Sequence, residues 1–191
     1  MHNTYYIEYI ELVGNVLHFP KIRTALTHDK RTTFQSLQVT PGVLRDRYKI
    51  GGAASQSKNN SQSCVQFLSQ YYSNADLEEF FLLFDRGNLG NTPTVVGYDG
   101  WGAGTEASLD IEYIMSVGNQ VPTTFWSVQD PTDPNEDAFL KWMLEIDKVS
   151  KVPLVFSVSY GEDEDELTSQ YAYRVNVEFQ KQGNFFFYLK G

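Results

Sequence analysis

The chain has 191 residues, of which 41% are hydrophobic and 15% aromatic, which is enough for one packed domain with an attached segment. Its 24 acidic residues outnumber 15 basic residues and give a formal net charge of −9, so nucleic acid and anionic membranes are excluded as main partners because phosphate groups would be repelled. No window approaches the ~18 apolar residues of a membrane span, and the N-terminus lacks the basic lead of a secretory signal.

Histidine and cysteine are scarce, which limits the chemistry available to the chain. One cysteine, Cys64, excludes an internal disulfide framework and a thiolate zinc site, and we interpret it as a small buried hydrophobic residue on a helix. The three histidines are His2, His18 and His28. Unless the N-terminal segment folds back, the body of the chain must catalyse with carboxylates, hydroxyls, amides or lysine, without imidazole and without a histidine-based metal site.

In chain order, the N-terminal segment differs from the rest. Residues 18–37 are basic and polar without a sustained period, which is typical of an exposed linker or a cleavable segment. Thr40-Pro41-Gly42 and the polar loop that begins at Gly51-Gly52 punctuate the chain. We therefore place a boundary near residue 38.

Helices and strands alternate after that boundary. Four helices and three strands are predicted between residues 61 and 160. The first helix runs from Ser61 or Ser63 to Tyr72, and the second is capped by Asp76 and runs to Leu83. A strand at 94–97, a helix at 106–117 that packs through Leu109, Tyr113, Ile114 and Val117, a strand at 123–128, a helix at 138–149 and a strand at 152–160 follow, and a last helix starts in the acidic run 162–166. Such alternation predicts βαβ units, a parallel sheet and an α/β fold.

The glycine-rich segment 100–105 lies between a predicted strand and a predicted helix, where a dinucleotide site is a possibility to test. Thr105 stands at the third glycine of that fingerprint, and no acidic residue follows at a distance of roughly 20 residues. A turn, or a close approach of the backbone, is therefore the favoured interpretation.

Glu106 and Asp110 have i, i+4 spacing, so both carboxylates project from one face of the predicted helix. One interpretation is that the helix dipole favours acids near the N-terminus. The other is a carboxylate pair that shares a proton, which suits acid–base chemistry at acidic pH. Such a pair could activate a nucleophile or cleave a glycoside.

Three further segments carry weaker signals. The acidic run Glu162–Glu166 lacks the oxygen spacing and central glycine of a calcium-binding EF-hand, so we interpret it as a solvated helix start. Ser159-Tyr160-Gly161, at the end of an apolar strand, could form a rim where a ligand meets exposed backbone. Asn59-Asn60-Ser61 is a glycosylation sequon in a polar loop.

Four stretches, in register, resemble the sedolisin family of serine-carboxyl peptidases, and within it the lysosomal tripeptidyl peptidases. They are TPGVLRDRYKIG, NNSQSCVQFLSQYYSNADLEEFF, GTEASLDIEYIMSVG and VSYGEDEDELTSQYAYRVNVE. The resemblance covers roughly residues 38–178, and LVGNVLHFP at 12–20 resembles the end of the family propeptide. It implies that 1–37 is the end of a propeptide with a linker, and that 38–191 is the N-terminal portion of a subtilisin-like catalytic domain whose pattern is lost after about residue 178.

The resemblance implies a role for each matched residue. Glu106 matches the general base that takes a proton from a serine nucleophile, and Asp110 matches the acid that orients this base. Ser159, Tyr160 and Gly161 match the strand whose backbone pairs with a peptide substrate. Asn59 matches a glycosylated position. The implied activity is release of tripeptides from free N-termini of proteins at acidic pH, by a glycoprotein zymogen of the lysosome.

The sequence departs from the family after Glu178. The segment S-G-D-S-G with the oxyanion-hole aspartate, the G-T-S segment with the nucleophile and the C-terminal calcium ligands of the family have no match here. We therefore expect a truncated product or an incomplete gene model, without metal ligands, without a signal peptide and without hydrolytic activity as given. An apolar terminus around residues 185–189 also predicts a marginal fold. Two alternatives stay open: a non-catalytic short form that binds peptide or a protein partner, and a carboxylate-based glycosidase.

Overall fold

The computed structural model describes residues 39–51, 57, 59–98, 100, 102–131, 137–161, 163, 165 and 167–182, together with the backbone of 186–188. The chain divides into two compact units, Met1–Leu37 and Gln38–Gly191, and every described residue belongs to the second. The predictions for residues 1–37 therefore lie outside the described residues.

A parallel sheet forms the centre of this unit, which confirms the predicted α/β fold. Its five strands have the order β2-β3-β1-β4-β5, and every pairing is parallel. The strands are β1 (Gln62–Gln66), β2 (Thr94–Gly97), β3 (Thr123–Ser127), β4 (Val155–Val158) and β5 (Phe186–Tyr188). β1 is the central strand, and its five residues are all buried.

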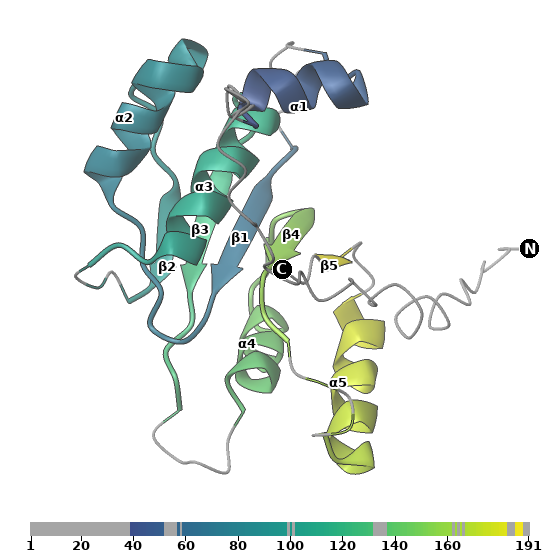
Figure 1. The fold of residues 1–191 in the computed structure, drawn as a ribbon. Helices are drawn as coiled ribbons and strands as arrows, with labels where there is room; N and C mark the ends of the chain where they lie inside the picture. Colours follow the sequence, from purple (N-terminus) through teal and green to yellow (C-terminus); the bar gives the residue numbers. More distant parts are fainter. Residues whose placement is uncertain are drawn as a thin grey trace, which may run out of the picture. The chain divides into compact units, whose positions relative to one another are not determined.

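Helices cover both faces of the sheet (Figure 1). They are α1 (Pro41–Tyr48), α2 (Asn74–Phe84), α3 (Thr105–Val117), α4 (Ala138–Ile146) and α5 (Ser169–Gln182), with a short 3₁₀ helix, η1, at Arg86–Asn88. α2 and α3 pack together and α1 contacts α3, whereas α4 packs against α5. None of the helices in the described ranges is both long and apolar enough to cross a bilayer.

Alternation along the strands divides the core into two clusters. On β1, Cys64 faces the cluster that α2 and α3 cover, and Val65 faces the cluster that α4 covers. Phe125 and Trp126 of β3 divide in the same way. Because successive strand side chains point to opposite faces, a parallel sheet covered on both sides needs apolar residues of both parities.

The connection through α3 has a different hand from its neighbours. The connections β2–α3–β3 and β3–α4–β4 both run in the same direction across the sheet, yet α3 and α4 lie on opposite faces. The crossover connections through α2, α4 and α5 therefore have the same handedness, and the crossover through α3 has the opposite handedness. Since about 98% of parallel crossovers are right-handed, we assign the left-handed crossover to α3. This places α3 beside α2 and over β1.

The structure corrects the predicted helix at 61–72, because Gln62–Gln66 is a strand. β1 was not recognised because three of its five residues are polar. The central strands of a parallel sheet are usually continuous apolar runs. Here these side chains are satisfied by hydrogen bonds: Gln62 Nε2 donates to Ile114 O at 2.9 Å, and Ser63 Oγ donates to Thr124 O at 2.8 Å. Cys64 is buried as predicted, but on this strand.

Other predictions need smaller corrections. The strand predicted at 94–97 is confirmed, and β3 and the helices α2, α3 and α4 lie where they were expected. α4 ends at Ile146, which is earlier than predicted. α2 is capped by Ser73, which accepts from the Asp76 amide at 3.2 Å, so Asp76 is not the cap. Of the predicted packing residues of α3, Ile114 packs against the core and Tyr113 contacts Phe80, but Leu109 is 49% exposed. The fully packed residues of α3 are Ala107, Ile111 and Met115, which have i, i+4 spacing. α5 begins only after the acidic run, and α1 was not predicted.

Candidate functional site

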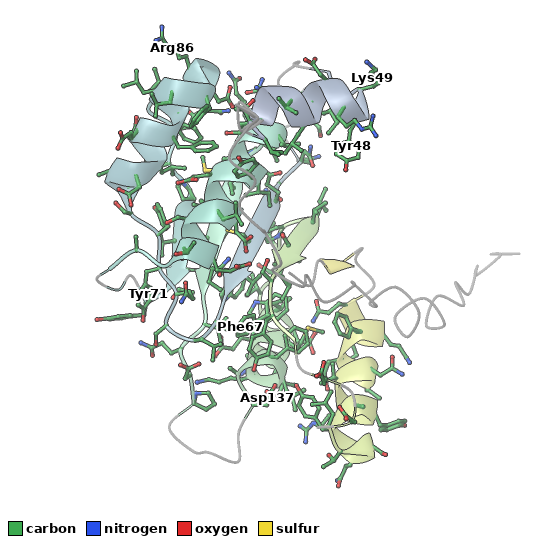
Figure 2. All side chains as sticks on the ribbon, viewed as in Figure 1. Tyr48, Lys49, Phe67, Tyr71, Arg86 and Asp137 are labelled. Atoms are coloured by element: carbon green, nitrogen blue, oxygen red, sulfur yellow. The ribbon has the colours of Figure 1, made fainter. Side chains whose placement is uncertain are left out.

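Several strands end at the same level, at the carboxyl edge of the sheet. Gln66 of β1 is in register with Ser127 of β3, and Ser127 is in register with Gly97 of β2. Val65 pairs with Val158, so Ser159 follows β4 at the level of Gln66. Ligands of open α/β sheets bind at this edge. Figure 2 shows Phe67 and Tyr71, which follow β1, at this end of the sheet.

The glycine-rich segment fixes the start of α3 at this edge. The amide of Gly104, the N-cap of α3, donates to Tyr71 O at 2.7 Å, and Tyr71 forms an isolated bridge with Ala103. A Cβ on Gly104 would lie 1.8 Å from Oε1 of Gln70, and a Cβ on Gly100 would lie 2.2 Å from the ring of Tyr71. Any larger residue at Gly100 or Gly104 would therefore displace the side chain of Tyr71 or Gln70.

Glu106 and Asp110 project from the first two turns of α3. Glu106 lies in the first turn and is half-buried, and Asp110 is half-buried one turn later. The Asp110 Oδ2 atom accepts a hydrogen bond from Gln66 Nε2 at 2.5 Å, and the Ser159 hydroxyl lies close enough to lower the pKa of this carboxyl. The structure thus brings α3, the end of β1 and the segment after β4 together around one carboxylate.

The electrostatics of Asp110 couple it to Glu106. Burial raises the pKa of Asp110, and the charge of Glu106 raises it further, while the hydrogen bonds from Gln66 and Ser159 lower it. A carboxylate that only matched the helix dipole would not need to be half-buried against the sheet. The Asp110 carboxylate thus senses the charge of Glu106, and the carboxylate pair that shares a proton stays a prediction.

Cys64 lies within the electrostatic range of Asp110 but is not a candidate nucleophile. Its side chain is fully buried, and burial followed by the charge of Asp110 raises the pKa of its thiol well above the usual value. The thiolate is the reactive form of cysteine, so this environment makes Cys64 inert.

Comparison with known proteins relates the chain to a group of enzymes of one name. Tripeptidyl-peptidase 1 of Bos taurus is 41% identical over 183 residues, which are 91% of this chain and 32% of that protein. The Mus musculus protein of the same name is 41% identical over 181 residues, and the Homo sapiens protein 39% identical over 184 residues, with the same coverage. No family model matches the chain.

Over 91% of its length the chain is homologous to tripeptidyl-peptidase 1, which supports the sedolisin family for a partial chain. It spans about a third of the length of the relatives that it matches. The family resemblance read from the four sequence stretches is confirmed, and a parallel α/β sheet is consistent with part of a subtilisin-like domain. The names of the relatives place the family among the peptidases.

The predicted substrate-binding segment has two differently oriented side chains. The Ser159 hydroxyl interacts with Asp110 of α3 and lowers the pKa of that carboxyl. The Tyr160 ring lies on the α4 side, where its centroid is 4.5 Å from that of Phe67 and 6.1 Å from that of Phe139, with which it is stacked. Gly161 is exposed. The two anchored side chains hold the backbone of this segment at the rim of the sheet.

The other predicted sites are far from this edge or only partly described. Asn59 is exposed in a turn, where its amide donates to Ser57 Oγ at 3.3 Å. Of the acidic run, Glu162, Glu164 and Glu166 lie outside the described residues. Within the part of the chain that the structure describes, no group of three His, Cys, Asp or Glu side chains could hold a metal ion.

Gln66 is the site residue that sequence reasoning missed. It is 2% exposed at the end of β1 and donates to Asp110, which lies 44 positions later. The sequence signal that could have identified it is a glutamine at the end of a short segment that contains β-branched and small residues. The predicted helix placed that glutamine on a polar face instead.

Proposed function

We propose that this protein is a serine-type peptidase that releases tripeptides from free N-termini at acidic pH. In this proposal Glu106 is the general base and Asp110 orients it. The observation that carries the proposal is the half-buried Asp110, coupled to Glu106 and bonded to Gln66 at the carboxyl edge of the sheet. The names and the identity of the relatives support the same activity.

Carboxylates suit this chemistry because of their ordinary pKa values. Histidine, with a pKa near 6.5, is protonated and unable to act as a base at a pH of about 4.5, whereas glutamate is about half ionised there. When the serine oxygen attacks the carbonyl carbon of the substrate, its proton passes to the Glu106 carboxylate. Protonated Glu106 then donates a hydrogen bond to ionised Asp110, and later returns the proton to the leaving amine as the C–N bond breaks.

Substrate binding would use the rim next to Asp110. An extended peptide can add to exposed strand backbone through main-chain hydrogen bonds. The backbone of Ser159–Gly161 is the segment that we assign to this role, because it follows β4 at the level of Gln66. The substrate would then lie close to the acid pair.

The nucleophile and the oxyanion-hole aspartate have no match in this sequence. We therefore propose that the 191-residue chain alone does not hydrolyse peptides, and that the pair works in a protein that includes those segments. The described residues do not fit a calcium site, so no step is assigned to the calcium of the family. A lysosomal location and a glycan on exposed Asn59 complete the proposal.

The proposal is tested with the protein isolated from its source and with recombinant variants that extend through the nucleophile. The substrate is a peptide with a free N-terminus, assayed at a pH of about 4.5, where half of an ordinary glutamate is ionised. Removal of the base in Glu106→Gln should lower kcat/KM by at least about 100-fold. Glu79→Gln, on the exposed face of α2, is the matched control and should keep full activity.

Two results would contradict the proposal. One is full tripeptide release by Glu106→Gln. The other is equal cleavage of the N-terminally acetylated peptide, because the proposed activity requires a free amine. A protein of 21.8 kDa that binds the peptide without cleaving it would instead support the binding alternative.

A further inference from the structure

The side chain of Gln66 connects the centre of the sheet to the helix that bears both acids. A buried amide has to be hydrogen-bonded, because an unpaired polar group in the interior is costly. Gln66 is 2% exposed, and its Nε2 atom donates to Asp110 Oδ2 at 2.5 Å. This contact therefore restrains the Asp110 carboxylate relative to β1.

Ser159 supplies a second donor from the adjacent strand. The register of β1 and β4 pairs Val65 with Val158, so Gln66 and Ser159 are at the next level of neighbouring strands. The Ser159 hydroxyl lies close enough to the Asp110 carboxylate to favour its ionised form. Both donors are neutral, and the salt bridges formed among the described residues do not include Asp110. The carboxylate is thus held without a cation that would neutralise it.

We propose that Gln66, together with Ser159, is a positioning residue that orients Asp110 toward Glu106 and stabilises the ionised form of Asp110. The catalytic meaning of this inference rests on the proposed function, in which ionised Asp110 accepts a hydrogen bond from Glu106 after Glu106 takes the proton of the serine. The titratable groups that interact with Asp110 are Glu106, on the same helix, and Cys64, from β1.

The test is a carboxyl ¹³C NMR titration of Asp110 in the 191-residue chain. Gln66→Leu removes the donor and keeps a similar side-chain volume. Because a hydrogen bond to a charged group favours the charged form, the pKa of Asp110 should rise by about one unit in this variant. A general loss of packing would not produce a selective change at one carboxyl.

Gln62→Leu is the matched control. Gln62 is also a buried glutamine of β1 on the same face, but its Nε2 atom donates to Ile114 O at 2.9 Å and Thr123 Oγ1 at 3.0 Å, at the other end of the strand. The pKa of Asp110 should not change in this control. The proposal is overturned if Gln66→Leu changes that pKa by less than about 0.2 units, or if Gln62→Leu changes it equally.

Ser159→Ala keeps the proposal testable if circular dichroism shows that Gln66→Leu does not fold. It removes one oxygen at the rim and should raise the pKa of Asp110 by about half a unit or more, whereas no shift overturns the proposal. The titration needs no peptidase activity, so its outcome is separate from that of the proposed function. A selective shift in a protein without tripeptide release would retain the positioning role and remove the peptidase.

Discussion

Glu112 makes the stability of this fold depend on pH in a direction that the structure determines. Burial, followed by the charge of Asp76 on α2, raises the pKa of Glu112 from 4.5 to about 7. The folded protein therefore binds this proton more tightly than the unfolded chain does. The resulting stabilisation is fully present below pH 4.5 and is lost as the pH rises through about 7.

The size of the effect follows from the pKa and the exposure. At 1.36 kcal/mol per unit, a rise from 4.5 to about 7 sets an upper limit of about 3 kcal/mol. Glu112 is only half-buried, so solvent screening reduces the expected contribution to about 1 kcal/mol. Glu112→Gln removes the titration while keeping the shape of the side chain.

Urea denaturation across this pH range measures the difference. The free energy of unfolding of Glu112→Gln, relative to the wild type, should increase by about 1 kcal/mol between acidic and neutral pH. Glu79→Gln on the exposed face of α2 should show a constant difference. Parallel pH profiles for the wild type and Glu112→Gln would refute the reasoning.

Three further predictions concern packing and reactivity. Trp142→Ala should lower the free energy of unfolding by about 3–5 kcal/mol in urea titrations, because Trp142 is fully buried; a loss below about 1 kcal/mol would contradict the observed packing. Gly104→Ala should destabilise the fold by about 1–3 kcal/mol, because its Cβ would meet Gln70, and Gln70→Ala in the same chain should restore part of the loss; thermal melts of the single and double variants measure this. Cys64 should react with a thiol reagent only after unfolding, and rapid labelling of the native protein would show that it is accessible.

Much of the fold could be predicted from local patterns. The apolar run at β2, the buried strand β3 and the amphipathic helices α2, α3 and α4 each carry their signal within one segment. β1 could not be recognised in this way, because its polar side chains are satisfied by partners on α3 and β3 that are distant in sequence.

The missed helix α1 shows a different limit. Its local signals are present: Pro41 at the start and Thr40 as the cap, which accepts from the Val43 amide at 3.3 Å. The helix is nevertheless short and mostly exposed. It is anchored by Arg45, whose Nη1 atom donates to Ser116 O at 2.5 Å and whose Nη2 atom lies 3.5 Å from Asp85 Oδ1. These contacts span distant segments and are invisible to local spacing.

The candidate site was likewise predicted from local spacing only in part. The i, i+4 spacing of Glu106 and Asp110 was sufficient to predict two acids on one helix face, and the structure adds that Asp110 is half-buried. Gln66 and Ser159 join the site only because β1 and β4 are neighbours in register. Ser159 was already a predicted site residue, but strand order is a tertiary property, so its place beside Gln66 could not be found before the sheet was known.

The central claim is that Glu106 and Asp110 are the acid pair of an acid-active peptidase. The most direct measurement is tripeptide release at a pH of about 4.5 by the native protein containing EASLDIEYIMSVG, with its mass and peptide map determined on the same sample. Our account predicts activity in a species larger than 21.8 kDa whose peptides include a serine nucleophile segment. An inactive species of 21.8 kDa that ends in FYLKG would contradict it.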